Sequence, residues 1–381
     1  MLGGILSMGK KFLLLYAGPN YEGNREFTSS DMQKVVSCGA TDYVILTTVG
    51  FNYLTKGGSQ ILTSNWVNSN IVTGNNITEN NSAASCADIR EDLNKLISEA
   101  PSSSYAEFVE AGLKLAKMVL AASSTAKIWF GLPRMIASSA ASLYVSPYVN
   151  NVIAPVKRGL TTAEWNRLEG FYFCQENLSQ YYTKFNRNNP STCFDNVVAK
   201  TFKSVADTVH NTYGKKTLWI PYYKDTTGDQ TATRVGCMVN LKCGGSNVFD
   251  IAMLQPMYYF HGSNCTDSGD GSSNFTLVKN CVAANACKYF SGKVVPSTTS
   301  TSPSAVKTSS TAVGFEMEID SEVTQSEYAS RYAKYASTFS TYYNGNAPYA
   351  FYAGSRASFL QSIVYNRVKN FFTKGTNSTA G

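Results

Sequence analysis

Eight short apolar runs alternate with amphipathic segments, and this alternation constrains the fold more than any other feature of the sequence. The segments between the runs, such as 105–122 and 192–213, have apolar residues at helical spacing. Strands that alternate with helices are typical of parallel sheets, and eight repeats predict a (β/α)8 barrel, an α/β fold. The predicted strands cover residues 12–16, 43–48, 127–132, 171–174, 218–220, 249–254, 313–319 and 350–352.

A doubly wound open sheet is the alternative fold for a chain with this pattern. Such sheets usually bind phosphate with a glycine-rich turn after the first strand. Here that turn is Gly18-Pro19-Asn20-Tyr21, which has a single glycine, and the sequence holds no G-x-x-x-x-G-K-S/T motif. We therefore expect the closed barrel and no nucleotide or other cofactor.

The repeats extend over residues 1–372 and predict a single barrel domain. A polar stretch at 52–85 is interpreted as an insertion after the second strand. The stretch 296–311 consists almost entirely of Ser, Thr, Pro and Val, which predicts an exposed, mobile loop before the seventh strand. Residues 373–381 are expected to form a disordered tail. The apolar run near the start is interpreted as the first strand rather than a signal peptide, and removal of a leader before residue 1 stays open.

Local signals also mark where individual helices begin and end. Residues 161–164, Thr-Thr-Ala-Glu, predict a capped helix that ends at Gly170. Residues 324–327, Thr-Gln-Ser-Glu, have the pattern of a second capping box. Both signals fall between predicted strands, as the barrel requires.

Composition and charge exclude several classes of protein. The chain is 43% hydrophobic and only 15% charged, which excludes a disordered or coiled-coil chain. Its net charge of +7 comes without a block rich in Lys and Arg, so a nucleic-acid partner is not expected. The apolar runs are all shorter than the roughly 18 residues that a membrane-spanning helix needs.

Sequons and cysteines favour a secreted or cell-surface protein. Asn-x-Ser/Thr sequons predict glycosylation at Asn76, Asn80, Asn264 and Asn274, and further sequons lie at Asn177 and Asn377. Disulfides are expected among Cys237, Cys243, Cys265, Cys281 and Cys287, with at least one of the nine cysteines left over. The chain has only two histidines, so no transition-metal site is expected.

Candidate site residues follow from the barrel prediction, because reactive groups of such barrels sit at the C-terminal ends of the strands. No histidine there accompanies a serine or cysteine as in an activated nucleophile. Carboxylate pairs lined by aromatic rings suit cleavage of glycosidic bonds. The predicted strand ends present Tyr16, Glu176, Asn177, Tyr222, Tyr223, Gln255, Tyr258, Glu316, Glu318, Asp320 and Tyr352.

The predicted seventh strand is the most informative, because residues 314–320 alternate strictly between apolar and acidic side chains. The alternation predicts that Glu316, Glu318 and Asp320 face the barrel lumen while the apolar residues face the helix layer. Like charges held this close should raise the pKa of at least one carboxyl, as a general acid requires. The alternative is a polar edge strand with both glutamates in solvent.

Glu176 follows the apolar run 171–174 and is the second candidate catalytic carboxyl. We assign it as the general acid/base, Glu318 as the nucleophile or base, and Glu316 as the residue that takes this role if Glu318 does not. A glutamate favoured at a helix start is the alternative for Glu176. Asn177 is expected either to bind a sugar hydroxyl or to carry a glycan, and the two roles exclude each other. The tyrosines, Gln255 and Asp320 are candidate substrate contacts.

Five blocks of the second half of the chain resemble a bacterial family known as "domain of unknown function 4855". These blocks are residues 171–176, 218–223, 249–260, 314–320 and 349–354, in matching order and spacing. The resemblance implies a glycoside-hydrolase-like barrel, for which no reaction is established. This chain departs from the family at Met257, where Asn is expected, and in the long Ser/Thr loop. The Met removes one amide that the resemblance would place in contact with a sugar.

Two functions remain open at this point. The first is a secreted glycoside hydrolase that acts on a polysaccharide or other glycan. The second is a non-catalytic carbohydrate-binding or structural glycoprotein of the cell surface, with self-assembly as a further property. A pseudo-enzyme would more often have lost one of the carboxylates, and here Glu176, Glu316 and Glu318 are all present.

Overall fold

The structure is a computed structural model of the whole chain. The residues that it describes are 10–17, 26–47, 54–56, 59–61, 102–132, 148–174, 176, 197–223, 231–262, 274–287 and 307–379.

Eight parallel strands close into one barrel in the order β1-β10-β9-β8-β7-β6-β5-β2, which confirms the predicted (β/α)8 fold and excludes the open sheet. A two-stranded antiparallel sheet of β3 (Leu54–Lys56) and β4 (Ser59–Ile61) lies within the predicted insertion. The barrel strands are β1 (Lys11–Ala17), β2 (Asp42–Thr47), β5 (Lys127–Leu132), β6 (Leu168–Phe173), β7 (Lys216–Trp219), β8 (Ile251–Leu254), β9 (Ala312–Glu318) and β10 (Tyr349–Tyr352).

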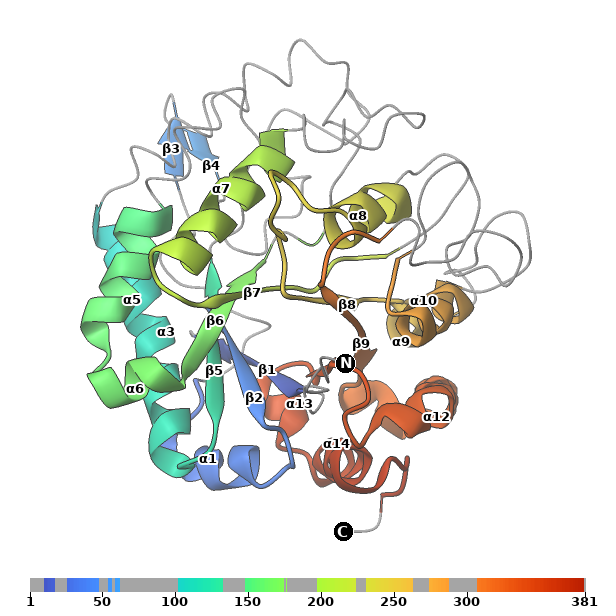
Figure 1. Cartoon of the computed structure of the whole chain (residues 1–381). Coiled ribbons are helices and arrows are strands. Elements are labelled where there is room, and N and C mark those ends of the chain that lie inside the picture. The colour runs from blue at the N-terminus through green and yellow to red at the C-terminus, as the bar shows by residue number, and fades with distance from the viewer. Residues whose placement is uncertain are drawn as a thin grey trace.

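Helices surround the strands in a ring, with α1 and α3 on one flank and α10 and α12 on the opposite flank (Figure 1). The longer helices are α1 (Ser29–Val36), α3 (Ser102–Ala122), α7 (Val197–Asn211), α8 (Thr231–Asn240), α10 (Asn274–Ala284), α12 (Ser326–Phe339) and α14 (Ser362–Lys374). Shorter elements are the π-helix η1 (Val149–Ile153), α5 (Ala154–Gly159), α6 (Thr162–Arg167), α9 (Tyr258–His261), α13 (Arg356–Phe359) and the 3-10 turns η4 (Ser321–Thr324) and η5 (Ser340–Tyr342).

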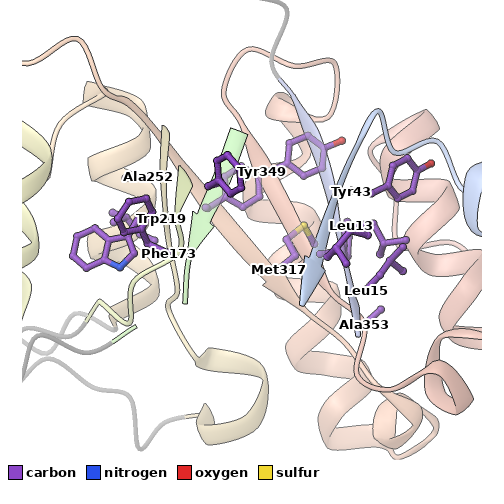
Figure 2. Packing of buried hydrophobic residues seen from close by; sticks show 14 of the residues in the cluster. Leu13, Leu15, Tyr43, Phe173, Trp219, Ala252, Met317, Tyr349 and Ala353 are labelled. Atoms are coloured by element: carbon purple, nitrogen blue, oxygen red, sulfur yellow. The ribbon is translucent and has the colours of Figure 1, made fainter. Parts of the chain in front are cut away.

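Strand alternation sorts the buried side chains into two cores. Along β1, Leu13 and Leu15 pack outward against the helices, whereas Leu14 belongs to a smaller cluster inside the barrel. Figure 2 shows part of the outer core, where Trp219 lies beside Phe173. The inner cluster contains Phe12, Leu14, Tyr16, Val44, Leu46, Trp129, Tyr172, Leu218, Ile220, Ile251, Met253 and Ala350. The barrel is therefore a packed core and not a pore, and only its ends are free for chemistry.

An ion network closes the end of the barrel at which the strands begin. The Glu169 carboxylate lies 3.2 Å from Lys10, 3.4 Å from Lys127 and 3.5 Å from Lys216. Lys10 also binds Asp42 at 2.9 Å. Burial alone would raise the pKa of Glu169, but the lysine charges outweigh it and the pKa is lowered. This end is thus stabilised, and the candidate carboxyls lie at the other end.

The predicted boundaries differ from the structure around Gly170. The capping signal at Thr161 is confirmed, because its hydroxyl accepts a hydrogen bond from the Glu164 N–H at 3.3 Å. Gly170, however, does not end the helix but lies inside β6, which begins at Leu168. A Cβ at this position would lie 2.2 Å from the Lys216 carbonyl oxygen, so close approach of β7 requires the glycine.

The second predicted capping box is wrong. Helix α12 begins at Ser326 with Gln325 as its N-cap, and no side chain caps it. The Thr324 hydroxyl instead donates to the Ser321 carbonyl at 3.2 Å inside the preceding 3-10 turn. Because this turn occupies residues 321–324, the helix starts one residue later than the Thr-x-x-Glu spacing indicates.

The Ser/Thr-rich stretch is packed at its C-terminal end, contrary to the prediction of a mobile loop as far as Thr311. The Thr311 hydroxyl is fully buried and donates to the Phe249 carbonyl at 2.6 Å. The backbone N–H groups of Thr308 and Ser309 donate to the Asn240 carbonyl at 2.7 and 2.9 Å. Residues 296–306 lie outside the described ranges. The last five residues of the stretch therefore belong to the barrel.

The tail is also more ordered than predicted. Helix α14 continues to Lys374 and ends at Gly375, whose φ of 66° suits glycine. Beyond it, the Asn370 side chain donates to the Ser378 carbonyl at 2.8 Å and the Asn366 side chain donates to the Thr379 carbonyl at 3.1 Å. The chain thus folds back on α14 as far as residue 379.

The disulfides and glycosylation sites predicted from the sequence can be compared with the structure at only some positions. Within the described ranges, no disulfide joins any two of Cys237, Cys243, Cys281 and Cys287, so the disulfides expected among these four are not formed. Cys265 lies outside those ranges. Asn76, Asn80 and Asn264 also lie outside, whereas Asn274 begins α10 and Asn377 is exposed. Among the described helices, each is too short or too polar to cross a membrane.

Candidate functional site

Glu316 and Glu318 of β9 lie on the same side of the barrel wall as the inner core. In the parallel register Glu316 is paired with Ala350 and Glu318 with Tyr352, and both partners belong to the inner cluster or pack against it. Phe315, Met317 and Ile319 lie in the outer core, as the alternation predicts. Glu318 ends the strand, so it lies at the C-terminal mouth of the barrel, while Glu316 lies one layer deeper.

The Glu318 carboxyl is buried and held through one of its two oxygens. Its Oε2 accepts a hydrogen bond from the Tyr335 hydroxyl at 2.8 Å and one from the Tyr259 backbone N–H at 3.2 Å. Burial raises the pKa of Glu318 to about 7; the two hydrogen bonds lower it, and the charges of Glu176 and Asp320 raise it. This carboxyl therefore changes charge near neutral pH, which is the range in which general acids and bases work best.

Glu316 is 4% exposed and, among the described residues, has no hydrogen-bond partner for its carboxyl. Burial, followed by the charges of Glu318 and Glu176, raises the pKa of Glu316 well above its ordinary value. The surroundings of Glu316 therefore favour its protonated form over its ionised form.

Glu176 lies three residues beyond the end of β6 and is half-buried. In the ring β6 is separated from β9 only by β7 and β8, and the charge of Glu176 acts on both Glu316 and Glu318. The backbone fixes its place, because the Glu176 carbonyl accepts the Tyr222 N–H at 3.0 Å. The charge of Glu176 therefore acts on the two predicted catalytic carboxyls of β9 from the same end of the barrel. Asn177, predicted beside them, lies outside the described residues.

Asp320 caps the turn that follows β9 instead of lying open to a ligand. One of its oxygens, Oδ1, accepts the Glu322 N–H at 2.9 Å and the Tyr259 hydroxyl at 2.8 Å. Burial raises the pKa of Asp320 against the effect of these hydrogen bonds. Its position next to Glu318 is as predicted, but its described contacts support the loop. Within the described ranges, no three His, Cys, Asp or Glu side chains are grouped to hold a metal ion.

Aromatic rings from three elements meet beside these carboxyls. Tyr16 of β1 contacts Tyr352 of β10 edge to face, with ring centroids 5.9 Å apart. Tyr352 in turn contacts Phe260 of α9, again at 5.9 Å. Tyr352 is half-buried, whereas Tyr16 is 6% exposed. Aromatic rings at a barrel mouth offer flat apolar surfaces against which the C–H faces of sugars can pack.

Two predicted substrate contacts point away from the mouth. Tyr223 is fully buried in the outer core, where its hydroxyl lies 3.6 Å from the Cys281 sulfur. The Tyr258 ring packs against Phe275 at 5.0 Å, on the side of α10, and Lys334 lies 4.7 Å above it. The side chains of Tyr223 and Tyr258 therefore support the helix layer, and their predicted role in substrate binding does not agree with their positions.

The remaining predicted contacts lie at the mouth but are partly engaged. Tyr222 is half-buried and forms a parallel bridge with Gln255. The Gln255 amide nitrogen donates to the Ile220 carbonyl at 2.9 Å, which ties the ends of β7 and β8 together. The Tyr222–Gln255 bridge and the Gln255 side chain therefore shape the mouth, and Tyr222 is the more exposed of the two residues.

Three residues of the site lie outside the set of predicted site residues: Tyr259, Phe260 and Tyr335. Tyr259 and Phe260 follow Tyr258 directly in the sequence. The prediction therefore chose the correct segment but named Tyr258 instead of the two residues after it. Met257, which precedes the run, has a φ of 50°, a left-handed conformation that Asn adopts more readily than Met. The Asn that the family resemblance leads one to expect here thus has a backbone reason besides any contact with sugar.

Comparisons with known proteins found similarity only at the level of the backbone. No family model matches the chain, and no curated protein matches it in sequence. The structure titled ZgEngAGH5_4 wild type has 12% identity and a TM-score of 0.41, over 93% of this chain and 90% of the other. The tandem GH20 catalytic modules of the pneumococcal exo-beta-D-N-acetylglucosaminidase StrH have 9% identity and a TM-score of 0.23, over 56% and 54%. The roles of individual residues therefore rest on the geometry of this chain alone.

Proposed function

We propose that this chain is a glycoside hydrolase that cleaves a glycan at the C-terminal mouth of its barrel. The observation that carries the proposal is the coupling of Glu176 to the buried pair Glu316 and Glu318 across that mouth. Cleavage of a glycosidic bond needs one carboxylic acid to protonate the leaving oxygen and one carboxylate at the sugar carbon. A buried carboxyl costs stability when it is ionised, so two buried glutamates on one strand, under the influence of the Glu176 charge, favour a functional explanation.

The surroundings of each carboxyl suggest its role. Glu318 serves as nucleophile or base, because two donors hold Oε2 and no described residue bonds Oε1. Glu176 serves as the acid/base, because it is half-buried and exchanges protons with solvent more easily than the buried pair. Glu316 lies one layer below, where burial and the charges of Glu318 and Glu176 favour its protonated form. Tyr16, Tyr352 and Phe260 provide the ring surface for the sugar.

We also propose that the protein works outside the cell, as the sequons and the low content of charged residues suggest. An extracellular location would give the site access to a polysaccharide. The resemblance to the "domain of unknown function 4855" family stays a prediction, because no family model matches the chain.

The experiment is a screen of nitrophenyl glycosides and polysaccharides, followed by kinetics of Glu176→Gln and Glu318→Gln on the best substrate. Both changes preserve shape and remove the proton donor or the carboxylate. Each should lower kcat at least a hundredfold, because acid–base assistance alone contributes about 10²–10⁴-fold. Binding of the glycan should survive. The anomer released, followed by NMR, separates a retaining from an inverting reaction.

Other outcomes of this experiment assign the site differently. Unchanged turnover in Glu318→Gln with loss in Glu316→Gln would transfer the role to Glu316. A glycan that binds the protein but is never cleaved would make the non-catalytic carbohydrate-binding protein the better account. Absence of both binding and cleavage across the screen would contradict the proposal.

A further inference from the structure

Tyr335 reaches the mouth from α12, in the helix layer outside the barrel. Its side chain is fully buried, and its ring packs edge-on against Phe275 at 4.9 Å and against Tyr258 at 6.0 Å. These contacts hold the ring in place. They position its hydroxyl 2.8 Å from Oε2 of Glu318 and 3.1 Å from the backbone nitrogen of Tyr258.

The direction of the hydrogen bond from Tyr335 follows from its partners. A tyrosine hydroxyl has one proton, and the N–H of Tyr258 can only donate, so it occupies a lone pair of the Tyr335 oxygen. The proton of Tyr335 is then free to point at Glu318. Tyr335 is therefore a donor with a fixed direction, polarised by the amide behind it.

The loop after β8 supplies the other donor. The N–H of Tyr259 binds the same oxygen of Glu318 directly, at 3.2 Å. The Tyr259 N–H thus donates directly to Glu318, whereas the Tyr258 N–H donates to the Tyr335 hydroxyl, which in turn donates to Glu318. Met257 precedes them with a φ of 50°, and this left-handed residue turns the chain so that the two N–H groups face β9.

Two acidic groups oppose the effect of these donors on the pKa of Glu318: Asp320, two residues later, and Glu176, beyond the end of β6. Glu316 lies one layer deeper on the same strand. From the other elements packed against Glu318 come Tyr352 of β10, Tyr259 of α9 and Tyr335 of α12. Burial and the neighbouring carboxylates disfavour the ionised form, and the hydrogen bonds of Tyr335 and Tyr259 favour it.

We propose that Tyr335 is a positioning residue that fixes the Glu318 carboxyl by its Oε2 and stabilises its ionised form, so that Oε1 is presented to the substrate. This inference rests on the proposed function. It adds that a residue of the outer helix layer sets the pH at which the mouth becomes active. Tyr335 itself does not contact the reacting atoms.

The test is the titration of Glu318 in Tyr335→Phe, which keeps the ring and removes only the hydroxyl. The carboxyl is followed by NMR in protein with ¹³C-labelled glutamate, and its signal is assigned by its loss in Glu318→Gln. Tyr332→Phe is the matched control, because Tyr332 is equally buried on α12 and donates to the Arg367 carbonyl at 3.1 Å instead. The wild-type signal should titrate near pH 7.

In Tyr335→Phe we expect the midpoint to rise by about one to two pH units, the equivalent of one hydrogen bond to a charged group. Tyr332→Phe should leave it in place. On a cleaved substrate, the acidic limb of the rate profile should move with the midpoint while KM changes little. An unchanged midpoint in folded Tyr335→Phe would overturn the inference.

A second variant keeps the test decisive if Tyr335→Phe does not fold. Met257→Val retains every hydroxyl but disfavours the left-handed turn that aims the two amides. Its Glu318 midpoint should also rise, and an unchanged midpoint there would equally reject the network. The titration needs no substrate. A raised midpoint in a protein that cleaves no glycan would therefore support the positioning by Tyr335 and reject the proposed function alone.

Discussion

Replacing Glu318 by Gln should stabilise the protein at alkaline pH and leave its stability almost unchanged in acid. Gln keeps the shape of the side chain and can accept the hydrogen bonds that Tyr335 and the Tyr259 N–H donate to Oε2. It removes only the charge that burial disfavours. Glu318 is 3% exposed, so solvent screens this effect little.

The magnitude follows from the raised pKa of Glu318. In the folded protein the pKa rises from its ordinary 4.5 to about 7. Below pH 4.5 both states carry the proton, and between pH 4.5 and 7 the unfolded state loses it first, so stability falls as pH rises. Above pH 7 the full cost is present, about 3.5 kcal/mol at about 1.4 kcal/mol per pH unit.

The assay is urea unfolding of the wild type and Glu318→Gln at about pH 4 and about pH 8.5. The variant should be about 3.5 kcal/mol more stable at the higher pH and equal within about 0.5 kcal/mol at the lower. Glu110→Gln, a change at an exposed position of α3, is the control and should show no such pH dependence. A gain of equal size at both values, or a loss at the higher, would refute the reasoning.

Three further changes test how the barrel holds the site. Gly170→Ala should cost more than about 3 kcal/mol in urea unfolding, because its Cβ would lie 2.2 Å from the Lys216 carbonyl and force β6 and β7 apart. Glu169→Gln should cost about 1–3 kcal/mol at neutral pH, and the loss should vanish as pH falls through the lowered pKa of Glu169. Thr311→Val should cost about 1–3 kcal/mol by leaving the Phe249 carbonyl unpaired.

Controls separate these effects from general sensitivity to mutation. Thr376→Val, at an exposed position near the end of the chain, should change stability by less than about 0.5 kcal/mol. If Thr311→Val leaves the free energy of unfolding unchanged, residues 307–311 contribute no stability and the predicted mobile loop is the better description of them. If Gly170→Ala leaves the free energy of unfolding unchanged, β6 and β7 can move apart to admit the Cβ without loss of stability.

The parts of the site that depend on strand alternation could be predicted, because that period is local. Glu316 and Glu318 face the lumen because every second residue of a strand shares a face. The same rule corrects Tyr223: it lies four residues after Trp219, whose side chain is in the outer core, so both point outward. Assigning Tyr222 and Tyr223 together to the mouth ignored this alternation.

Contacts between layers could not be predicted from local patterns. Tyr335 follows Glu318 by 17 residues, and their contact depends on how α12 packs against the barrel. Composition also misled the prediction at Thr311, because small polar residues are typical of loops but also form buried hydrogen bonds at the start of a strand. Capping signals were reliable where no other turn competed, as at Thr161, and failed at Thr324, where η4 occupies the same residues.

The central claim is that ionised Glu318, facing Glu176, acts on a glycan at the barrel mouth. Its most direct test is the pH dependence of kcat/KM on the best cleaved glycan, measured for the wild type and Glu318→Gln. We predict an acidic limb with a midpoint near 7 in the wild type, and loss of at least a hundredfold in rate in the variant. A wild-type profile that is flat between about pH 5.5 and about pH 8.5, or full activity of Glu318→Gln, would contradict the account.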